Sequence, residues 1–360
     1  MKFAIAAAGT GGHVYPALAV AEELVKRGHD RDDVVFFGGD RLEATAVPAA
    51  GFPFVAVEVR GLKRSISPSN LMLPVMVARA ASKMAKTIRS RGVSAVLAMG
   101  GYVTGPAAIA ARRTRSQLVI HEQNGLPGLA NRLASRVASE VLVAFPSAAA
   151  KLRRATVVGN PLRAEFVGFD RAQLKPLALA RYGLDAQRPV LGVLGGSLGA
   201  KVLNEVTAHI VAGSAGTDLA VVHLTGTMHV DSVTQAAHGA PVPWVVSPFE
   251  ESMEFFYAAS DLVLSRAGAI TISELAATGT PAVTVPLEAV AQAANASFLA
   301  EAGAAEVVRQ SDIDSVPQLI HHLIGDAHKL AAMSAAARSV ATPDAAQRVA
   351  VALEEVAGRG

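Results

Sequence analysis

Short aliphatic and β-branched runs alternate with helical patterns along this chain of 360 residues, and they do so in two separate series. Such alternation is typical of parallel α/β folds, in which a helix follows each strand and crosses back over the sheet. The first series comprises Lys2–Ala7, Asp33–Phe37, Phe54–Val57, Ala95–Met99, Leu118–His121 and Val141–Val143. The second comprises Pro189–Leu194, Ala220–Leu224, Val245–Val246, Leu262–Ser265 and Ala282–Val285. We therefore expect two doubly wound, Rossmann-like α/β domains that face each other across a cleft.

The domain boundary is expected within Val158–Phe169, with an N-terminal domain at residues 1–161 and a C-terminal domain at residues 165–340. A last helix is expected at residues 344–356, packed back on the first domain. Charge changes at the same place: up to Arg163 there are 22 Lys and Arg against 10 Asp and Glu, and after it 11 against 20. The resulting charges of +12 and −9 indicate that the N-terminal half meets an anionic partner.

Composition excludes several classes of protein. A hydrophobic content of 51% excludes a disordered chain, and the absence of cysteine excludes disulfides, thiol nucleophiles and Cys-bound zinc. The lack of basic-aromatic interleaving argues against nucleic acid and leaves an acidic membrane surface as the better anionic partner. The apolar run Phe3–Ala8 is too short for a signal peptide, and glycines and Pro106 divide Ala95–Ala111 into a strand, a turn and a helix start.

A glycine-rich turn, Gly9-Thr10-Gly11-Gly12-His13, follows the first expected strand, and a helix is expected from Pro16 to Lys26. Backbone N–H groups in such a turn can approach a phosphate or a sugar oxygen, although a tight turn without a ligand is equally compatible. Val14 stands where the dinucleotide fingerprint requires glycine, which argues against a nicotinamide dehydrogenase. His13 would lie at the C-terminal edge of the sheet, and its pKa range suits a general base that accepts a hydroxyl proton.

The second half repeats this arrangement in Gly195-Gly196-Ser197-Leu198-Gly199, and the turn Ser265–Ala269 opens a helix that carries Glu274. Helix N-termini favour diphosphate oxygens, and a carboxylate one and a half turns along can accept two ribose hydroxyls. By itself Glu274 could equally be a solvated helix carboxylate.

Several further segments carry a resemblance to a known family. They are Met99–Val103 with Gly105-Pro106, His121-Glu122-Gln123-Asn124-Gly125, Val158–Pro161 with Arg163, and Arg266 with Gly268-Ala269 and Thr271–Glu274. Together with the two glycine-rich turns, they make the chain similar over essentially its full length to the MurG family of peptidoglycan N-acetylglucosaminyltransferases. Two departures are Ala8 at the first glycine of the family's opening turn and a loop after Pro286 that is about two residues shorter than in relatives.

The resemblance implies a GT-B fold and inverting, metal-independent transfer without a cofactor. The donor would be UDP-N-acetylglucosamine, the acceptor the C4 hydroxyl of N-acetylmuramic acid in undecaprenyl-linked lipid I, and the product lipid II. It also implies a peripheral protein on the cytoplasmic face of the cell membrane, active in cell-wall synthesis and cell division, with proteins of those processes as candidate partners.

Site residues follow from the same resemblance. His13 would be the general base. The uracil would lie near Phe249 and Glu250, the ribose on Glu274, and the diphosphate at Ser197 and at the turn of Ala269, Ile270 and Thr271. Asn124 and Gln292 would hold sugar hydroxyls, and Thr10, Gly11, Gly12 and Arg163 would complete the donor site.

A membrane face is predicted from the apolar run Leu71–Val77 and the cations around it, because an interfacial surface combines apolar and cationic side chains. The cations are Arg60, Lys63, Arg64, Arg79, Lys83, Lys86, Arg89, Arg112, Arg113 and Arg115. A core helix with a solvated basic edge is the competing interpretation until the resemblance is considered.

Two other functions remain open at this point. One is another enzyme of the same fold, a UDP-N-acetylglucosamine 2-epimerase or a glycolipid glycosyltransferase. The other is a non-catalytic nucleotide-sugar binder or division scaffold. An epimerase would need acidic and histidine groups around the sugar C2, which the sequence does not reveal. A scaffold would have no chemical reason to keep all of the residues His13, Asn124, Ser197, Glu274 and Gln292.

Overall fold

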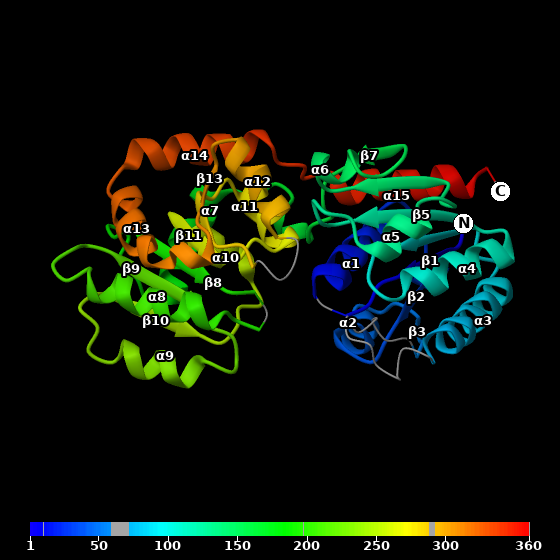
Figure 1. Cartoon of the computed structure of the whole chain (residues 1–360), viewed down its shortest axis with the longest axis horizontal. Coiled ribbons are helices and arrows are strands. Elements are labelled where there is room, and N and C mark those ends of the chain that lie inside the picture. Colours follow the sequence, from blue (N-terminus) through cyan, green and yellow to red (C-terminus); the bar gives the residue numbers. More distant parts are fainter. Residues whose placement is uncertain (10, 59–71, 197, 288–291, 360) are drawn as a thin grey trace. The chain divides into compact units, whose positions relative to one another are not determined.

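The computed structural model describes residues 1–9, 11–58, 72–196, 198–287 and 292–359. The chain divides into two compact units, one formed by Met1–Ala164 with Pro343–Gly360 and the other by Glu165–Thr342. Each unit contains one parallel sheet with helices on both faces, so the expectation of two doubly wound α/β domains is confirmed (Figure 1).

The first unit has a seven-stranded sheet of order β3-β2-β1-β4-β5-β6-β7. Its strands are β1 (Phe3–Ala6), β2 (Val34–Gly38), β3 (Phe54–Ala56), β4 (Ala95–Ala98), β5 (Gln117–Glu122), β6 (Glu140–Val143) and β7 (Ala155–Val157). Its helices are α1 (Gly11–Lys26), α2 (Leu42–Ala49), α3 (Leu73–Arg91), α4 (Thr104–Thr114), α5 (Leu129–Ala134), α6 (Pro146–Ala149) and α15 (Ala345–Ala357).

Two apolar layers enclose this sheet, because both faces of its central strands are buried. Phe3 and Ile5 face α1, α2 and α15, whereas Ala4 and Ala6 face α3 and α4. The last helix therefore supplies core residues to the unit that the first strand begins. The strand order changes direction between β1 and β4, and ligands bind outside the carboxyl ends of the strands at such a point.

The second unit has a six-stranded sheet of order β10-β9-β8-β11-β12-β13. Its strands are β8 (Val190–Leu194), β9 (Ala220–Leu224), β10 (Trp244–Ser247), β11 (Leu262–Ser265), β12 (Ala282–Thr284) and β13 (Ala305–Val307). Its helices are α7 (Arg171–Tyr182), α8 (Lys201–Ala212), α9 (Val230–Ala237), α10 (Met253–Ala259), α11 (Ala269–Thr278), α12 (Ala293–Glu301), α13 (Val316–Ile324) and α14 (Ala327–Ser339).

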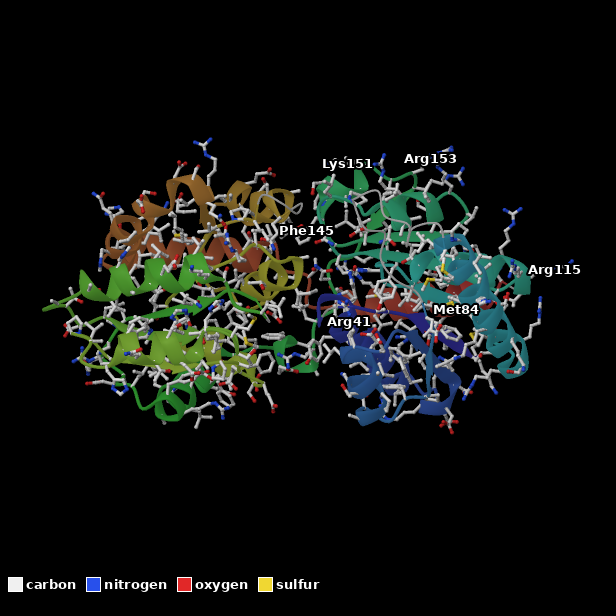
Figure 2. The ribbon with its side chains drawn as sticks, turned by 60° about the horizontal axis from the view of Figure 1, so that its bottom comes forward. Arg41, Met84, Arg115, Phe145, Lys151 and Arg153 are labelled. Atoms are coloured by element: carbon white, nitrogen blue, oxygen red, sulfur yellow. The ribbon has the colours of Figure 1, made fainter. Side chains whose placement is uncertain are left out.

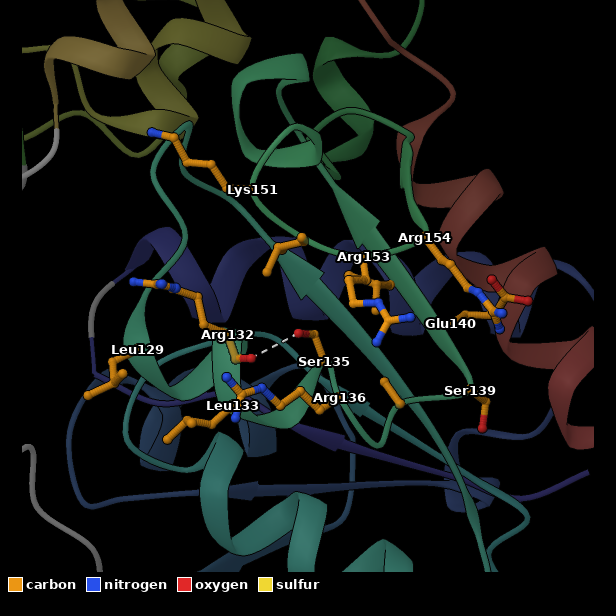
Figure 3. Close-up of a pocket in the computed structure, with 13 residues that line it drawn as sticks. Leu129, Arg132, Leu133, Ser135, Arg136, Ser139, Glu140, Lys151, Arg153 and Arg154 are labelled. Atoms are coloured by element: carbon orange, nitrogen blue, oxygen red, sulfur yellow. Dashed lines mark hydrogen bonds between the residues drawn. The ribbon is translucent and has the colours of Figure 1, made fainter.

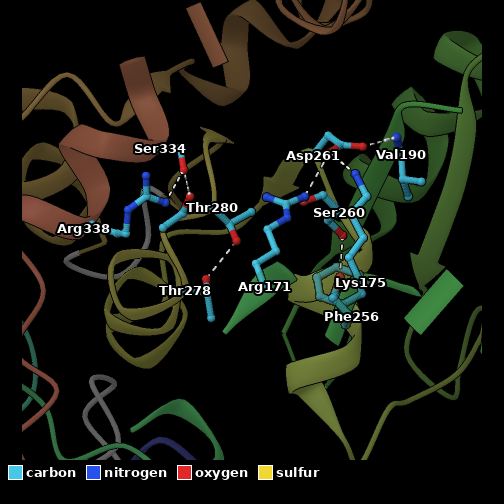
Figure 4. A network of polar contacts seen from close by, with 11 residues as sticks. Arg171, Lys175, Val190, Phe256, Ser260, Asp261, Thr278, Thr280, Ser334 and Arg338 are labelled. Atoms are coloured by element: carbon cyan, nitrogen blue, oxygen red, sulfur yellow. Dashed lines mark hydrogen bonds and ion pairs between the residues drawn. The ribbon is translucent and has the colours of Figure 1, made fainter. Parts of the chain in front are cut away.

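Asp261 joins the first helix of this unit to its sheet (Figure 4). The carboxylate accepts hydrogen bonds from Arg171 at 3.0 Å, from Lys175 at 2.6 Å and from the backbone N–H of Val190 at 2.9 Å. Arg171 also donates to the carbonyl of Ser260. Because one carboxylate contacts the start of α7 and the start of β8 together, it fixes the first turns of α7 at the N-terminal end of the strands.

Three sequence expectations about elements are corrected. The first helix begins at Gly11 rather than Pro16, so Pro16 lies inside it and His13 lies in its first turn. Strands β7 and β13 were not expected from the sequence. Strand β10 is longer than the expected Val245–Val246. No helix in the described part of the chain combines the length and apolar character that a membrane span requires.

Candidate active site

The turn between β1 and α1 brings Gly11, Gly12 and His13 to the carboxyl end of the first sheet. Thr10 lies outside the described residues. Because a proline nitrogen carries no hydrogen, Pro16 cannot give the Gly12 carbonyl its helical hydrogen bond. The first turn of α1 therefore leaves polar backbone groups at the sheet edge where a ligand would bind.

His13 is half-buried and contacts the loop that follows β5. Its Nδ1 lies 3.1 Å from Oε1 of Gln123, a residue 110 positions away in the sequence. Burial lowers the pKa of His13, and it outweighs the opposing effects of Glu122, Gln123, a backbone hydrogen bond with Met99, and Glu43. A histidine with a lowered pKa is neutral at pH 7 and is thus in the form that accepts a proton.

Gly100 and Gly101, which follow β4, allow this close packing around the imidazole. Their φ angles of +86° and +74° lie in the left-handed region. A Cβ at Gly100 would lie 3.3 Å from Cε1 of His13 and 3.2 Å from Oε1 of Gln123. The ends of β1, β4 and β5 therefore meet around His13.

Asn124 is held by its neighbour Glu122, whose side chain is 3% exposed. Oε1 of Glu122 accepts hydrogen bonds from the backbone N–H of Asn124 at 3.0 Å and from its Nδ2 at 3.2 Å. Oε2 accepts from the backbone N–H of Gly128 at 3.0 Å and from Nδ2 of Asn131 at 2.9 Å. Glu122 thus orients Asn124, a role that sequence reasoning did not assign.

Glu43 and Arg163 complete the polar groups near the first turn of α1. Glu43 is fully buried and accepts hydrogen bonds from the backbone N–H groups of Gly9 at 3.2 Å and Gly39 at 2.8 Å. The guanidinium of Arg163 lies 5.5 Å from the ring centroid of Tyr15 on α1, within the range of a cation–π contact. Sequence reasoning named Arg163 but missed Glu43, since no motif links residue 43 to residue 9.

In the second unit, the glycine-rich turn connects β8 to α8, as expected. Ser197 lies outside the described residues. Gly199 has a φ of +72°, and a Cβ there would collide with the carbonyl oxygen of Thr225. The turn can therefore pass this close to β9 only with glycine at residue 199.

Glu274 lies on α11, and Ala269, Ile270 and Thr271 form the first turn of that helix. Glu274 is 9% exposed and accepts a hydrogen bond of 2.8 Å from the hydroxyl of Tyr257, so it is not a solvated helix carboxylate. The N–H groups of Ile270 and Thr271 precede the helical hydrogen-bond ladder and can bind an anion.

Phe249 and Glu250 follow β10 and differ in exposure. Phe249 is 50% exposed, whereas the Glu250 carboxylate accepts hydrogen bonds from Arg181 at 2.9 Å, from the Tyr182 hydroxyl at 2.9 Å and from the Ser252 backbone at 3.0 Å. Burial opposes ionisation of Glu250, but these donors hold its pKa below the ordinary value. The Glu250 carboxylate is therefore already hydrogen-bonded within the protein.

Gln292 precedes α12, and its Oε1 accepts a hydrogen bond of 2.9 Å from the backbone N–H of Leu287. Residues 288–291 lie outside the described residues. Asn295 is fully buried and donates to the carbonyl of Ala267 at 3.1 Å, which ties α12 to the turn before α11. Among the described residues, no group of three or more His, Cys, Asp or Glu side chains could hold a metal ion.

A separate surface of the first unit combines apolar and cationic side chains. Exposed apolar residues gather on α3, α4 and α5 and on the residues just before α3 and just after α5: Met72, Val75, Ile109, Leu129, Leu133 and Val137. Between these helices lies an apolar groove of about 550 Å³. Of the predicted face, Leu71, Arg60, Lys63 and Arg64 lie outside the described residues.

A neighbouring cavity of about 890 Å³ is lined by five cations, which we call the basic cluster (Figure 3). It consists of Arg132, Arg136, Lys151, Arg153 and Arg154. Figure 2 shows Lys151 and Arg153, like Arg115 directly after α4, pointing outward from this unit. The cavity and the apolar groove share Leu129 and Leu133 of α5. Sequence reasoning missed this cluster because it combines α5 with the segment before β7, an edge strand that the sequence did not reveal.

Comparisons with known proteins cover nearly the whole chain. Residues 3–143 match the glycosyltransferase family 28 N-terminal domain, and residues 190–349 match the C-terminal domain of that family. A UDP-N-acetylglucosamine–N-acetylmuramyl-(pentapeptide) pyrophosphoryl-undecaprenol N-acetylglucosamine transferase of Methylococcus capsulatus is 43% identical, with 98% of each chain covered. One of the same name from Halorhodospira halophila is 40% identical over 98% of each chain. The crystal structure of Acinetobacter baumannii MurG superposes with a TM-score of 0.78 at 31% identity, covering 99% of this chain and all of that one.

Proposed function

The chain belongs to glycosyltransferase family 28 and within it to the MurG N-acetylglucosamine transferases, and from this we propose its reaction. It transfers N-acetylglucosamine from UDP-N-acetylglucosamine to the C4 hydroxyl of N-acetylmuramic acid in lipid I, which yields lipid II for peptidoglycan synthesis. The observation that carries this proposal is the identity of 40–43% to transferases of that name over 98% of the chain.

In the proposed reaction, the acceptor oxygen attacks C1 of N-acetylglucosamine from the face opposite UDP. The new C1–O bond forms as the bond to the diphosphate breaks, so the configuration at C1 inverts. The acceptor proton passes to His13 and UDP leaves with the bonding electron pair. The neutral state of His13 at pH 7 supports its role as the general base.

The donor is proposed to lie against the second unit. The first turn of α11, at Ala269, Ile270 and Thr271, binds the diphosphate through backbone N–H groups, where charge accumulates as UDP leaves. The buried carboxylate of Glu274 accepts the ribose hydroxyls. Ser197 contributes to the diphosphate site.

The uracil is proposed to contact Phe249 and the backbone of Glu250. The Glu250 carboxylate is already bound by Arg181 and Tyr182, which supports a backbone contact rather than a carboxylate contact. Asn124 and Gln292 hold sugar hydroxyls. Thr10, Gly11, Gly12 and Arg163 complete the donor site.

We propose that the protein is peripheral to the cytoplasmic face of the cell membrane, with the apolar groove and the basic cluster directed to anionic lipid. The combination of exposed apolar side chains with neighbouring cations supports this orientation. The lipid tail of the acceptor supplies the reason, since the reacting sugar stays close to the bilayer surface.

Transfer of labelled N-acetylglucosamine to a soluble lipid I analogue tests the proposed function. We expect lipid II analogue from the unmodified protein and a rate about 10²-fold to 10⁴-fold lower from His13→Ala, the range that general base catalysis contributes. UDP binding should be unchanged in that variant. The matched control His209→Ala, at an exposed position of α8, should retain full activity. Hydrolysis or epimerisation of the donor without transfer to the analogue would refute the proposal.

A further inference from the structure

A series of three hydrogen-bond contacts, the last of them to a backbone carbonyl, leads from His13 into the core of the first unit. Nδ1 of His13 faces Oε1 of Gln123 at 3.1 Å, and Nε2 of Gln123 faces Nδ1 of His121 at 3.3 Å. Nε2 of His121 faces the carbonyl oxygen of Gly159 at 2.9 Å. Gln123 is 1% exposed and His121 is fully buried, so water does not compete for these contacts.

The buried end of this series determines which atom donates and which accepts in each hydrogen bond. A carbonyl oxygen only accepts, so Nε2 of His121 carries a hydrogen and its Nδ1 presents a lone pair. The side-chain amide of Gln123 must then donate through Nε2 to that lone pair, which turns its Oε1 toward His13. An amide oxygen only accepts, so Nδ1 of His13 carries the hydrogen.

We infer that Gln123 and His121 are positioning residues that hold His13 as the Nδ1–H tautomer, so that its Nε2 lone pair is available to the acceptor hydroxyl. An isolated neutral histidine favours the opposite tautomer, in which Nε2 is protonated and cannot accept. The inference rests on the proposed function for the role of that lone pair. The tautomer itself can be measured without any activity.

Charged and titratable groups from several elements face these hydrogen-bonded side chains. Glu122 of β5 and Glu43 of α2 favour the protonated form of His13, whereas burial opposes it and dominates, so its pKa lies below the ordinary value. Burial also lowers the pKa of His121 to about 4, despite the Gly159 hydrogen bond, and His13 adds a smaller effect in the same direction. His121 is therefore neutral at pH 7, as it must be for its Nδ1 to accept a hydrogen bond from Gln123.

The backbone of Met99 provides the competing arrangement. It makes a hydrogen bond with the His13 ring that also raises the pKa of His13, with a smaller effect than that of Gln123. If the Met99 carbonyl took a hydrogen from Nε2, the ring would be in the opposite tautomer and Gln123 would have no part in its orientation.

Nitrogen-15 NMR of the full chain labelled in its histidine rings decides between the two arrangements. We expect Nδ1–H for His13 and Nε2–H for His121 at pH 7.5, with the His13 signals assigned by their loss in His13→Asn. An Nε2–H tautomer for His13 in the unmodified protein would overturn the inference, whatever the activity.

Two substitutions of Gln123 separate positioning from packing. Gln123→Leu removes the acceptor, so His13 should lose the Nδ1–H tautomer and kcat should fall by about tenfold to a hundredfold, less than in His13→Ala. Gln123→Glu keeps an acceptor for Nδ1–H, so the tautomer should remain.

The acid limb of the kcat–pH profile should then shift in opposite directions in Gln123→Glu and Gln123→Leu. The carboxylate of Gln123→Glu favours imidazolium and raises the pKa of His13, which shifts the limb to higher pH. Gln123→Leu lowers that pKa and shifts the limb to lower pH. Identical profiles for both variants would indicate a structural role alone and overturn the inference.

The second unit offers a matched control, because His223 and Asn204 form a comparable buried imidazole–amide contact of 3.0 Å. Asn204→Leu should change the His223 signals and leave the His13 tautomer and the kcat–pH profile as they are. If Gln123→Leu removes the Nδ1–H tautomer but transfer continues at the full rate, the positioning role stands and His13 is not the base of the reaction.

Discussion

Glu43 is a buried carboxylate that accepts hydrogen bonds from backbone N–H groups rather than pairing with a cation. Among the described residues no Lys, Arg or His side chain pairs with it, and its oxygens accept from Gly9 and Gly39 and, at 3.4 Å, from the Tyr102 hydroxyl. Backbone N–H donors on both oxygens satisfy a buried carboxylate because each bond is charge-assisted. Glu43 therefore fixes the turn before α1, on which the position of His13 depends.

Glu43→Gln should destabilise the first unit. The new amide nitrogen would face a backbone N–H, which leaves one buried donor unsatisfied at a cost of about 1–3 kcal/mol. Urea unfolding measures the change in the free energy of unfolding. Glu22→Gln, at a partly exposed carboxylate paired with Arg31, is the control and should cost less than about 1 kcal/mol. Equal costs for the two variants would contradict the role given to Glu43.

Buried neutral histidines should make stability fall on mild acidification. Burial lowers the pKa of His121 to about 4 and that of His223 to about 3, against about 6.5 in an unfolded chain. Below pH 6.5 the unfolded chain binds protons that the folded chain does not, so the free energy of unfolding decreases as pH falls toward 4. For His121 this loss amounts to about 3 kcal/mol by pH 4, since each pKa unit is worth about 1.4 kcal/mol.

Urea unfolding at pH 7.5 and at pH 5.0 measures this loss. Glu250 and Glu354, whose pKa values lie below the ordinary 4.5, contribute only in more acidic solution. His223→Phe should reduce the difference between the two pH values. An unchanged difference in that variant would assign the effect to other groups.

At the scale of elements, the short helix α5 connects the two parts of the proposed membrane face. Leu129 and Leu133 are 65% and 54% exposed. Arg132 lies between them in the sequence, and Arg136 follows shortly after the end of α5. Sequence reasoning selected α3 and α4 because their apolar and basic runs are long. Helix α5 has six residues, and its contribution becomes visible only where it packs beside α4.

Arg132→Ser with Arg136→Ser should weaken binding to anionic vesicles by about thirtyfold, since each of the two cations near such a surface is worth about 1 kcal/mol and every 1.4 kcal/mol is about tenfold. Binding to neutral vesicles should not change. The control pair Lys201→Ser and Arg309→Ser removes two exposed cations of the second unit and should leave vesicle binding unaltered. Sedimentation with vesicles at low and high salt measures the effect, and equal losses for both pairs would refute the proposed face.

Strands β7 and β13 were not predicted from the sequence because they are short and lie at the edges of their sheets. Both have three residues, and only one residue of β13 and none of β7 is buried. A strand at the edge of a sheet has little apolar surface to bury, so its composition does not separate it from a loop. The early start of α1 was missed for another reason: Pro16 is typical of the first position of a helix, but here it occupies a later turn.

At the scale of the whole molecule, α15 belongs to the unit that begins the chain. Its residues Val349, Ala350 and Leu353 are fully buried in the same apolar cluster as Phe3 and Ile5. Arg27 and His29 also contact Glu354 at 2.7 Å and 2.9 Å. The N-terminal unit is thus completed only by the last residues of the sequence.

Leu353→Ala should lower the stability of the first unit by about 2–5 kcal/mol, the usual cost of a large-to-small change in a core. Amide hydrogen exchange should quicken in β1 and β4 and stay unchanged in β8 and β11. Leu177→Ala, at a position 61% exposed on α7, is the control and should alter neither unit. Faster exchange in β8 would show that α15 stabilises the second unit as well.

The sequence by itself determined the two series of buried strands and helices, the glycine-rich turns and the segments that mark the family. These are local properties, since burial periodicity and the φ requirement of glycine are written in neighbouring residues. Only the tertiary structure decided that Glu43 reaches Gly9, that Gln123 meets His13 across 110 residues, and that α5 joins the basic cluster to the apolar groove. The physical reason is the strand order: β4 pairs with β1, and β5 with β4, so their carboxyl ends gather residues that the chain separates, and no short pattern encodes that arrangement.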